Sequence, residues 1–495
     1  MPDHPQPARH HESRAFLHVE PPTGQDRDAL GPVVAISRPD HRVPVQGVHW
    51  LSHDERDRYA LAVESAGAFE RQRPEIEGPH DECGDETYGG EHTRRRHKPS
   101  RANAVEFQSR QVSAVLIESE DSITAQYQYS SYIELYLTTR FPDGNFTFLN
   151  AGIGGDTANG GSARFQKHVL DEKPTAVTIN FGMNDGGYGK FNPGANKVYV
   201  EKTRAMLDAA KKAGVRVALL SPNAVDRRNK SNGAEYVETQ KQFYAPLKDI
   251  AGEFGTAFVD QYAITRAATD AMEKDDPKAE KAKPYYDGFH TSPPGGLLMA
   301  GAILTGLNAP ALVSDVTIDA AGSQAIAKAC KVEDVKATDA GVTFTRTDSA
   351  LPVPVQKDWL PMLPYMSELK NLNWYGLTVK GLKDGDYTVS IDGVAVGKFA
   401  AKDLAAGVNL GNVTAGPIWE QGNKVLQAIS AKNNLVGQRF FGVVMFNAPD
   451  WLKDVADERK PAELKKRMEK IEAAQAEVYK LAKPVPHKFE IAPAK

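Results

Sequence analysis

The sequence predicts an α/β fold over its middle part and a smaller all-β region after it. From about residue 111 to 312, short apolar runs of strand length alternate with segments whose apolar residues recur at helical spacing. This alternation is typical of a parallel sheet that is covered by helices on both faces. After about residue 312, strand-like runs follow one another with turn signals between them, which is typical of a small sandwich.

The expected elements of the α/β region follow in chain order. The expected strands are 112–117, 146–149, 176–181, 215–220 and 256–260. Apolar side chains at helical spacing predict helices at 131–137 and 198–213, and Gly214 is a typical stop for the second of them. In sheets of this kind, ligands bind beyond the carboxyl ends of the strands. We therefore expect functional residues in the loops after the first three strands.

The second region contains short strands and a turn signal. The expected strands are 316–318, 342–344, 374–379, 387–391 and 394–399. Asp392 and Gly393 separate the last two strands by two residues, which predicts a hairpin turn. Three tryptophans, Trp359, Trp374 and Trp419, could stack on sugars in a carbohydrate-binding module. A structural role is favoured for them, because buried core tryptophans are more common.

The last part of the chain predicts one amphipathic helix. Residues 461–482 repeat apolar side chains at helical spacing, and Pro461 suits the first position of a helix. We expect this helix to pack against the rest of the protein and the residues after Pro484 to form a loose tail. The predicted domains are therefore a leader at 1–110, a catalytic domain at 111–312, a β-rich accessory domain at 313–450 and a helix with a tail at 451–495.

The first 110 residues differ in composition from the rest of the chain. They hold ten of the thirteen histidines and fourteen arginines, but only one lysine, Lys98. Proline and charged residues are scattered there without a helical or strand period, which predicts a disordered leader. One hypothesis is that the leader is a mis-started or shifted-frame translation. Its histidines show no ligand spacing with cysteine, so no metal site is predicted.

Charge and hydropathy bear on partners and location. The net charge is −4 at pH 7, which gives no general attraction to nucleic acid. No apolar run reaches the ~18 residues that a membrane span requires. No signal peptide is visible at Met1, so the location stays open, and a secreted or periplasmic protein fits a start further along the chain. The oligomeric state is not predicted.

Four short motifs carry the chemistry of an acyl-transfer site. Ser122 follows the first expected strand, and a serine hydroxyl is a weak nucleophile unless a base lies next to it. His290 suits this role because imidazole titrates near neutral pH, and Asp287 can hold its second ring nitrogen. Gly155 and Asn184, after the second and third strands, offer a backbone N–H and a side-chain amide as oxyanion donors. The Ser122 N–H is a third expected donor.

Each motif has a structural alternative. Ser122 and the aspartate before it could cap a helix, the glycines around Gly155 could form an ordinary turn, Asn184 could lie in a turn, and His290 could be a loop histidine. Nucleotide binding is not favoured, because Thr157 stands where G-x-G-x-x-G needs its third glycine. No G-x-S-x-G occurs, which disfavours the α/β-hydrolase fold. The order of the four motifs, three of them at strand ends, favours the catalytic interpretation.

Over roughly residues 112–310 the chain resembles the SGNH hydrolases, the GDSL esterase/lipase family. The first block is Glu120-Asp121-Ser122, where the family usually has Gly-Asp-Ser, and the blocks at Gly155, 182–185 and 287–290 are intact. The resemblance implies a flavodoxin-like three-layer α/β/α domain with a parallel sheet. It also implies site roles without a metal or organic cofactor: Ser122, Asp287 and His290 are catalytic, and Gly155 and Asn184 bind the oxyanion.

We therefore expect a serine esterase or acylhydrolase that cleaves carboxylic ester bonds through an acyl-enzyme. The expected partner is a small-molecule or glycan ester. Carbohydrate acetyl esters are favoured, because the stretch 127–129 and the loop 186–190 suit a polar ligand that needs hydrogen bonds and stacking. The alternative is a noncatalytic glycan-binding protein on a decayed hydrolase fold, which Glu120 and the unusual leader motivate.

Overall fold

The structure, a computed structural model, describes residues 113–229, 233–338, 341–366 and 372–494. The predicted leader at 1–110 lies outside the described residues. All described residues belong to one compact unit of the chain, Val43–Lys495. None of the helices within these ranges combines the length and the apolar character that a bilayer crossing requires.

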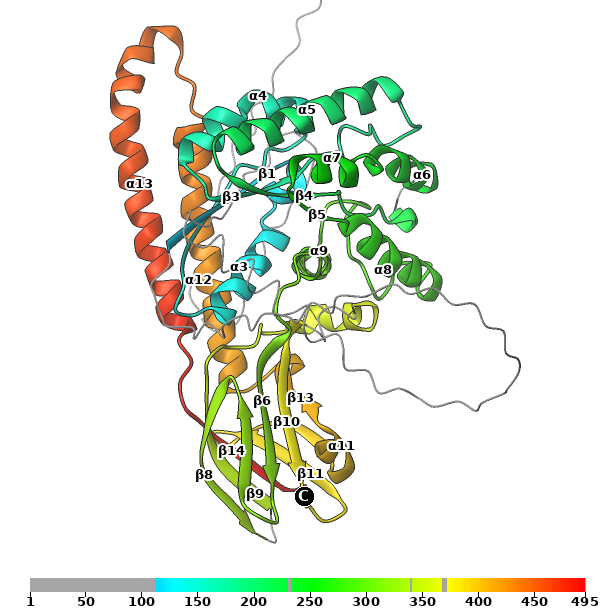
Figure 1. The fold of residues 1–495 in the computed structure, drawn as a ribbon, viewed down its shortest axis with the longest axis vertical. Helices are drawn as coiled ribbons and strands as arrows, with labels where there is room; N and C mark the ends of the chain where they lie inside the picture. Colours follow the sequence, from blue (N-terminus) through cyan, green and yellow to red (C-terminus); the bar gives the residue numbers. More distant parts are fainter. Residues whose placement is uncertain (1–112, 230–232, 339–340, 367–371, 495) are drawn as a thin grey trace, which may run out of the picture. The chain divides into compact units, whose positions relative to one another are not determined.

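A five-stranded parallel sheet forms the centre of the first region (Figure 1). Its strands are β1 (Ser113–Glu120), β2 (Asn145–Asn150), β3 (Ala176–Asn180), β4 (Arg216–Leu220) and β5 (Ala257–Val259). Their order across the sheet is β2-β1-β3-β4-β5, and every neighbouring pair is parallel. This is the flavodoxin-like order, in which the chain changes direction across the sheet between β1 and β3. The predicted parallel sheet is confirmed.

Helices cover both faces of this sheet and make a three-layer α/β/α domain (Figure 1). One face carries α3 (Gln128–Arg140), α8 (Gln261–Asp275) and α9 (Pro293–Gly306), and the other carries α4 (Ala158–His168), α5 (Pro193–Lys212) and α7 (Leu247–Phe254). The side chains of β2 alternate accordingly, because successive residues of a strand point to opposite faces. Phe146 and Phe148 pack in the core with α3 and α9, whereas Leu149 packs in the core with α4 and α5. A one-turn helix, α2 (Ser122–Ala125), follows β1, and α6 (Gly233–Tyr244) lies between β4 and α7.

Two further sheets confirm the predicted β-rich region. The strands of the first are β6 (Leu312–Asp319), β7 (Gln324–Lys328), β10 (Trp374–Lys380) and β13 (Val408–Asn409), and those of the second are β8 (Cys330–Thr338), β9 (Gly341–Asp348), β11 (Asp386–Ile391), β12 (Val394–Ala400) and β14 (His487–Pro493). Their apolar side chains share one core, so the two sheets form a sandwich. Asp392 and Gly393 have φ values of 48° and 81° between β11 and β12, as a two-residue hairpin turn requires. Among the described strands of this sandwich, β6 and β10 are the one pair that runs parallel.

The end of the chain differs from its prediction in two ways. The predicted loose tail is wrong, because β14 pairs with β11 on one side and β9 on the other. The predicted helix begins earlier, since α13 spans Lys453–Ala482 and places Pro461 inside it. A proline there removes one helical hydrogen bond, which a long helix packed along its later turns tolerates. A helix that was not predicted, α12 (Pro417–Arg439), precedes it.

These two helices return to the α/β domain. They pack against each other and against α3 and β2. The edge strand β2 is covered in this way, and the Phe146 N–H donates to the Tyr479 hydroxyl at 3.1 Å. Trp359 is buried against Tyr132, with ring centroids 4.7 Å apart, and therefore has the structural role that was favoured for it. The predicted domain boundaries at 312 and 450 stay a prediction.

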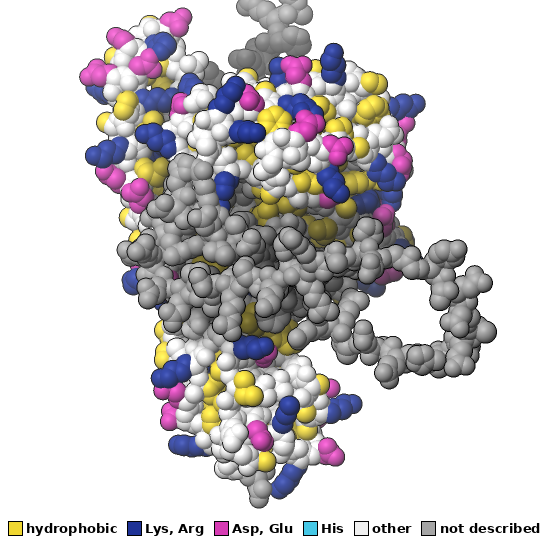
Figure 2. Space-filling view, viewed as in Figure 1, with side chains coloured by type: hydrophobic (Ala, Val, Ile, Leu, Met, Phe, Trp, Pro, Cys, Tyr) yellow, Lys and Arg dark blue, Asp and Glu magenta, His cyan; other side chains and the backbone are white. Residues whose placement is uncertain are grey.

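The surface carries both signs of charge. On the face drawn in Figure 2, Lys and Arg side chains of the described residues are interspersed with Asp and Glu side chains. This mixture accords with the small net charge of −4.

Candidate active site

Ser122 stands at the start of a helix, directly beyond the carboxyl end of β1. Asp121 is the N-cap of α2, and its Oδ1 accepts a hydrogen bond from the Ile123 N–H at 2.9 Å. The capping interpretation of this motif is therefore correct for Asp121, while Ser122 is the first helical residue. The first N–H groups of a helix have no partner within the helix, so the Ser122 N–H is suited to bind an anion.

His290 connects Ser122 to Asp287. The Ser122 Oγ lies 2.8 Å from the His290 Nε2, and the His290 Nδ1 lies 2.7 Å from the Asp287 Oδ2. The other carboxylate oxygen, Oδ1, accepts from the backbone N–H groups of His290 at 2.9 Å and Phe289 at 3.2 Å. Gly288 has a φ of 103°, a conformation that favours glycine and lets the turn close on its own carboxylate. This is the arrangement in which a carboxylate orients an imidazole toward a hydroxyl.

The charge of Asp287 is fixed by its hydrogen bonds. Burial acts to raise the pKa of this carboxyl, but the His290 ring and the two backbone N–H groups outweigh it and lower the pKa to about 2. The carboxylate is therefore ionised across the neutral range and can stabilise a protonated imidazole.

Two side chains hold the His290 loop in place, and sequence reasoning identified neither. The Gln126 Oε1 accepts from the Thr291 N–H at 3.1 Å, which ties the loop to the α2 turn that carries Ser122. The Asn223 Nδ2 donates to the Phe289 carbonyl at 3.3 Å from the loop after β4. The only sequence signal for Gln126 is its position one helical turn after Ser122.

The two expected oxyanion donors lie in loops that touch each other. The Asn184 Nδ2 donates to the Asp156 carbonyl at 2.9 Å and to the Asp121 Oδ2 at 3.3 Å. Asn184 thus bridges the loop after β2 and the turn before Ser122. Gly155 has a φ of 75°, and a Cβ there would meet no atom within 4 Å, so its backbone conformation rather than space favours glycine.

The loop that contains Gly155 is closed by an arginine that was not predicted. Arg164 donates from Nε to the Asp156 Oδ2 at 2.7 Å and from Nη1 to the Ala151 carbonyl at 2.6 Å. It therefore joins the two ends of the loop from within α4. Sequence reasoning treated Asp156 only as part of the glycine motif.

Asp121 is a buried carboxyl next to the candidate nucleophile. Burial raises its pKa to about 7, although the Ile123 N–H and His290 oppose this shift. The folded protein therefore binds this proton more tightly than the unfolded chain, whose Asp titrates near 3.8. Between about pH 4 and about pH 7 the folded state still holds this proton while the unfolded chain has lost it. The free energy of unfolding therefore falls as pH rises through this range.

We expect Asp121→Asn to reduce the loss of stability between acidic and neutral pH, because asparagine keeps an oxygen acceptor for the Ile123 N–H and cannot ionise. The measurement is the free energy of unfolding in urea at pH 4.5 and pH 7.5. The decrease between the two should be smaller in the variant, but not zero, because burial also raises the pKa of Asp185 to about 6. Asp384→Asn, at an exposed loop position, is the matched control and should keep the wild-type decrease. An Asp121 variant with the wild-type decrease would contradict this assignment.

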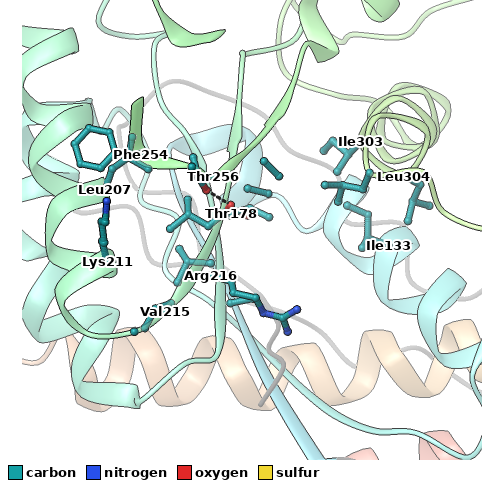
Figure 3. Close-up of a pocket in the computed structure, with 18 of the residues that line it drawn as sticks. Ile133, Thr178, Leu207, Lys211, Val215, Arg216, Phe254, Thr256, Ile303 and Leu304 are labelled. Atoms are coloured by element: carbon teal, nitrogen blue, oxygen red, sulfur yellow. Dashed lines mark hydrogen bonds between the residues drawn. The ribbon is translucent and has the colours of Figure 1, made fainter. Parts of the chain in front are cut away.

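A separate cavity lies at the other end of the parallel sheet (Figure 3). It has a volume of about 450 Å³ and is lined by the first residues of three strands, Ala176, Arg216 and Ala257. Ile133 of α3 and Ile303 of α9 contribute to its apolar wall. The candidate catalytic residues follow the opposite ends of the strands, where ligands of such sheets bind. The cavity is therefore separate from the candidate site.

Within the described ranges, no three His, Cys, Asp or Glu side chains gather where a metal ion could bind. The histidines of the leader lie outside these ranges.

Comparison with known proteins gives a family match. Residues 121–296 match the GDSL-like Lipase/Acylhydrolase family. An acetylxylan esterase from Geobacillus stearothermophilus is 27% identical over 182 residues, which are 36% of this chain and 78% of that protein. Esterase TesA from Pseudomonas aeruginosa is 31% identical over 119 residues, 23% of this chain, and the match spans about half of that protein, 52%.

A solved structure extends the similarity in fold. BT4096, described as a gut microbial diltiazem-metabolizing enzyme, superposes with a TM-score of 0.65. The match covers 77% of this chain and 97% of that chain at 23% sequence identity. At this identity the likeness concerns the fold alone.

Proposed function

Residues 121–296 form a GDSL-like lipase/acylhydrolase domain of the SGNH hydrolase superfamily, whose activity is carboxylic ester hydrolysis, and we propose the residues that carry this activity. We propose that Ser122, His290 and Asp287 are the catalytic triad of this domain. The observation that carries the proposal is the chain of two contacts, 2.8 Å from Ser122 to His290 and 2.7 Å from His290 to Asp287. We propose further that the protein cleaves small acyl esters through an acyl-enzyme.

The first half of the reaction forms the acyl-enzyme. The Ser122 Oγ attacks the ester carbonyl carbon while the His290 Nε2 takes the hydroxyl proton. The carbonyl oxygen becomes negative and accepts hydrogen bonds from the N–H groups of Ser122 and Gly155 and from the Asn184 amide. The carbon–oxygen bond to the alcohol then breaks, and His290 gives its proton to the departing oxygen. Asp287, ionised, stabilises the imidazolium between the two transfers.

Water completes the cycle. His290 takes a proton from a water molecule, whose oxygen attacks the acyl carbon of the acyl-enzyme. The same donors bind the second oxyanion. The bond from the carbon to the Ser122 Oγ breaks, and His290 returns the proton to Ser122. The acid leaves, and every group is restored without a metal or organic cofactor.

Carbohydrate acetyl esters are the proposed substrate class. Similarity to an acetylxylan esterase supports a glycan ester. The loop after Asn184 places Tyr188 near the site, and the centroid of its ring lies 4.7 Å from that of Phe289. Tyr188 therefore offers a hydroxyl and an aromatic face for a polar ligand. These features support a short acyl group on a polar alcohol.

Two assays test the proposal directly. The protein should hydrolyse p-nitrophenyl acetate, and a fluorophosphonate probe should label Ser122, because both need an activated serine. A noncatalytic glycan-binding protein would do neither. A panel of acetylated glycans and medium-chain esters then tests the substrate class. A higher kcat/KM for medium or long acyl chains would overturn the preference for acetyl groups.

The oxyanion role of Asn184 has its own expected result. Asn184→Ala removes one side-chain donor and leaves nucleophile and base in place, so we expect kcat to fall by about 10²–10³-fold with KM nearly unchanged. Probe labelling of Ser122 should slow and remain detectable, since two backbone donors are left. Asn434→Ala, at a half-buried position of α12 where the amide donates to the Ser430 carbonyl, is the matched control and should keep the wild-type kcat. If Asn184→Ala raised KM alone, Asn184 would be a ground-state binding residue instead.

A further inference from the structure

The amide of Asn184 is held from both ends. Its Nδ2 donates to the Asp156 carbonyl at 2.9 Å and to the Asp121 Oδ2 at 3.3 Å, and its Oδ1 accepts from the Tyr188 hydroxyl at 2.8 Å. A backbone carbonyl can only accept, so the contact with Asp156 determines which end of the amide carries the N–H groups. Rotating the amide by half a turn would place an oxygen against the Asp156 carbonyl. Tyr188 is therefore the residue that satisfies and fixes the other end.

The backbone of this loop is bent in order to present Tyr188. Gly187 and Tyr188 have φ values of 67° and 57°, and a left-handed conformation is unfavourable for a side chain as large as tyrosine. Such a conformation persists only where the surroundings compensate it, and it is found most often at functional sites. Here the compensation is the hydrogen bond to Asn184 and the packing of the ring.

The ring of Tyr188 lies between two aromatic neighbours. Its centroid is 5.3 Å from that of Tyr236 and 4.7 Å from that of Phe289, and the Phe289 ring is 4.5 Å from the His290 ring. Tyr236 is itself anchored, because its hydroxyl donates to the Met183 carbonyl at 2.7 Å. The aromatic row therefore connects the Asn184 motif with the loop that carries the candidate base.

We propose that Tyr188 is a positioning residue, which acts through Asn184 by fixing the side-chain amide in the orientation that donates to the oxyanion. This inference rests on the proposed function, because it concerns the oxyanion donor of the same site. Tyr188 itself makes no contact with the reacting atoms in the proposed reaction. Its hydroxyl holds the Oδ1 end of the amide while the Asp156 carbonyl holds the N–H end, and its ring packs against Phe289.

Two physical effects follow from the hydrogen bond. A fixed amide keeps its orientation when negative charge develops on the carbonyl oxygen: the oxyanion takes over the N–H that donates to the Asp121 Oδ2 at 3.3 Å, while the other N–H stays on the Asp156 carbonyl. Donation to the Oδ1 also polarises the amide and strengthens the Nδ2–H groups as donors. Burial raises the pKa of the Tyr188 hydroxyl well above its ordinary value, so the hydroxyl keeps its proton and remains a donor across the working pH range.

The test is a double-mutant cycle on kcat for p-nitrophenyl acetate. Tyr188→Phe removes the hydroxyl and keeps the ring, and we expect kcat to fall about fivefold to tenfold with KM nearly unchanged. In the Asn184→Ala background the same substitution should change kcat by less than about twofold, because the amide that it positions is gone. Tyr188→Leu also removes the ring, so its kcat should fall further than that of Tyr188→Phe. The matched control is Tyr387→Phe, which removes a hydroxyl bonded to the Lys383 carbonyl in the β sandwich and should leave kcat unchanged.

Each result decides between the alternatives. A wild-type kcat for Tyr188→Phe would overturn the inference, and so would an equal loss in the presence and absence of Asn184, since that would indicate a general structural role. Thermal unfolding of each variant identifies any that fail to fold. The rate of fluorophosphonate labelling gives a second measure of the effect of Tyr188→Phe on the site. Failure of the proposed function looks different, because Ser122→Ala and Asn184→Ala would then keep the wild-type rate.

Discussion

Ser122→Ala is expected to abolish covalent labelling by a fluorophosphonate and to lower kcat for p-nitrophenyl acetate by roughly 10⁴–10⁶-fold. The variant lacks the oxygen that forms the bond to the acyl carbon, so His290 and Asp287 have no nucleophile to activate. The remaining rate would come from substrate binding and from oxyanion donors that still face the carbonyl. In a variant that still folds, such a loss of several orders of magnitude indicates a residue that takes part in the chemistry.

The fold should tolerate this change. The Ser122 side chain makes its hydrogen bond with His290, and the capping bond of α2 belongs to Asp121. The temperature of unfolding should therefore move little, which separates loss of chemistry from loss of structure. Ser349→Ala, in the β sandwich, is the matched control and should keep both labelling and kcat. A Ser122→Ala protein with a near wild-type rate would exclude Ser122 as the nucleophile and leave the proposed triad without its first member.

Lys432→Met is expected to destabilise the protein by about 3–5 kcal/mol, the largest effect on stability that we expect from one substitution. The Lys432 Nζ lies 2.6 and 2.9 Å from the two carboxylate oxygens of Glu134, and both side chains are 0% exposed. Burial raises the pKa of Glu134, and the charge of Lys432 opposes that shift. Without Lys432 the carboxylate would be left buried without its counter-charge, which costs far more than the pair contributes.

This ion pair joins two distant parts of the chain. Glu134 lies on α3, which follows the Ser122 turn, and Lys432 lies on α12, after the β sandwich. Urea unfolding of wild type, Lys432→Met and the double variant Glu134→Leu/Lys432→Met measures the effect. The double variant should recover most of the lost stability, because neither charge of this pair remains buried. Lys480→Met breaks an exposed pair with Glu477 and should cost less than about 0.5 kcal/mol. If Lys432→Met were no more destabilising than Lys480→Met, the pair would have no role in holding α12 to α3.

The sequence by itself determined the features that depend on a few neighbouring residues. The strands of the parallel sheet, the turn at Asp392 and Gly393 and the four motifs were all recognisable, because strand periodicity and turn chemistry act over short stretches. Their order along the chain was enough to predict a parallel sheet with its candidate site at the carboxyl ends. The proximity of Ser122 and His290, 168 residues apart, was expected from the chemistry that they would share and from the family resemblance.

The tertiary structure decided the features that depend on distant partners. The residues after Pro484 carry too short a pattern to predict a strand, and they become β14 only because β9 and β11 offer hydrogen bonds on both sides. Gln126 and Tyr188 have ordinary sequence surroundings, and their roles follow from contacts with Thr291 and Asn184. The raised pKa of Asp121 likewise depends on burial, which the neighbouring residues in the sequence do not predict. Local sequence selects the conformation of a segment, but the free energy of a polar group depends on what surrounds it, and packing alone supplies those surroundings.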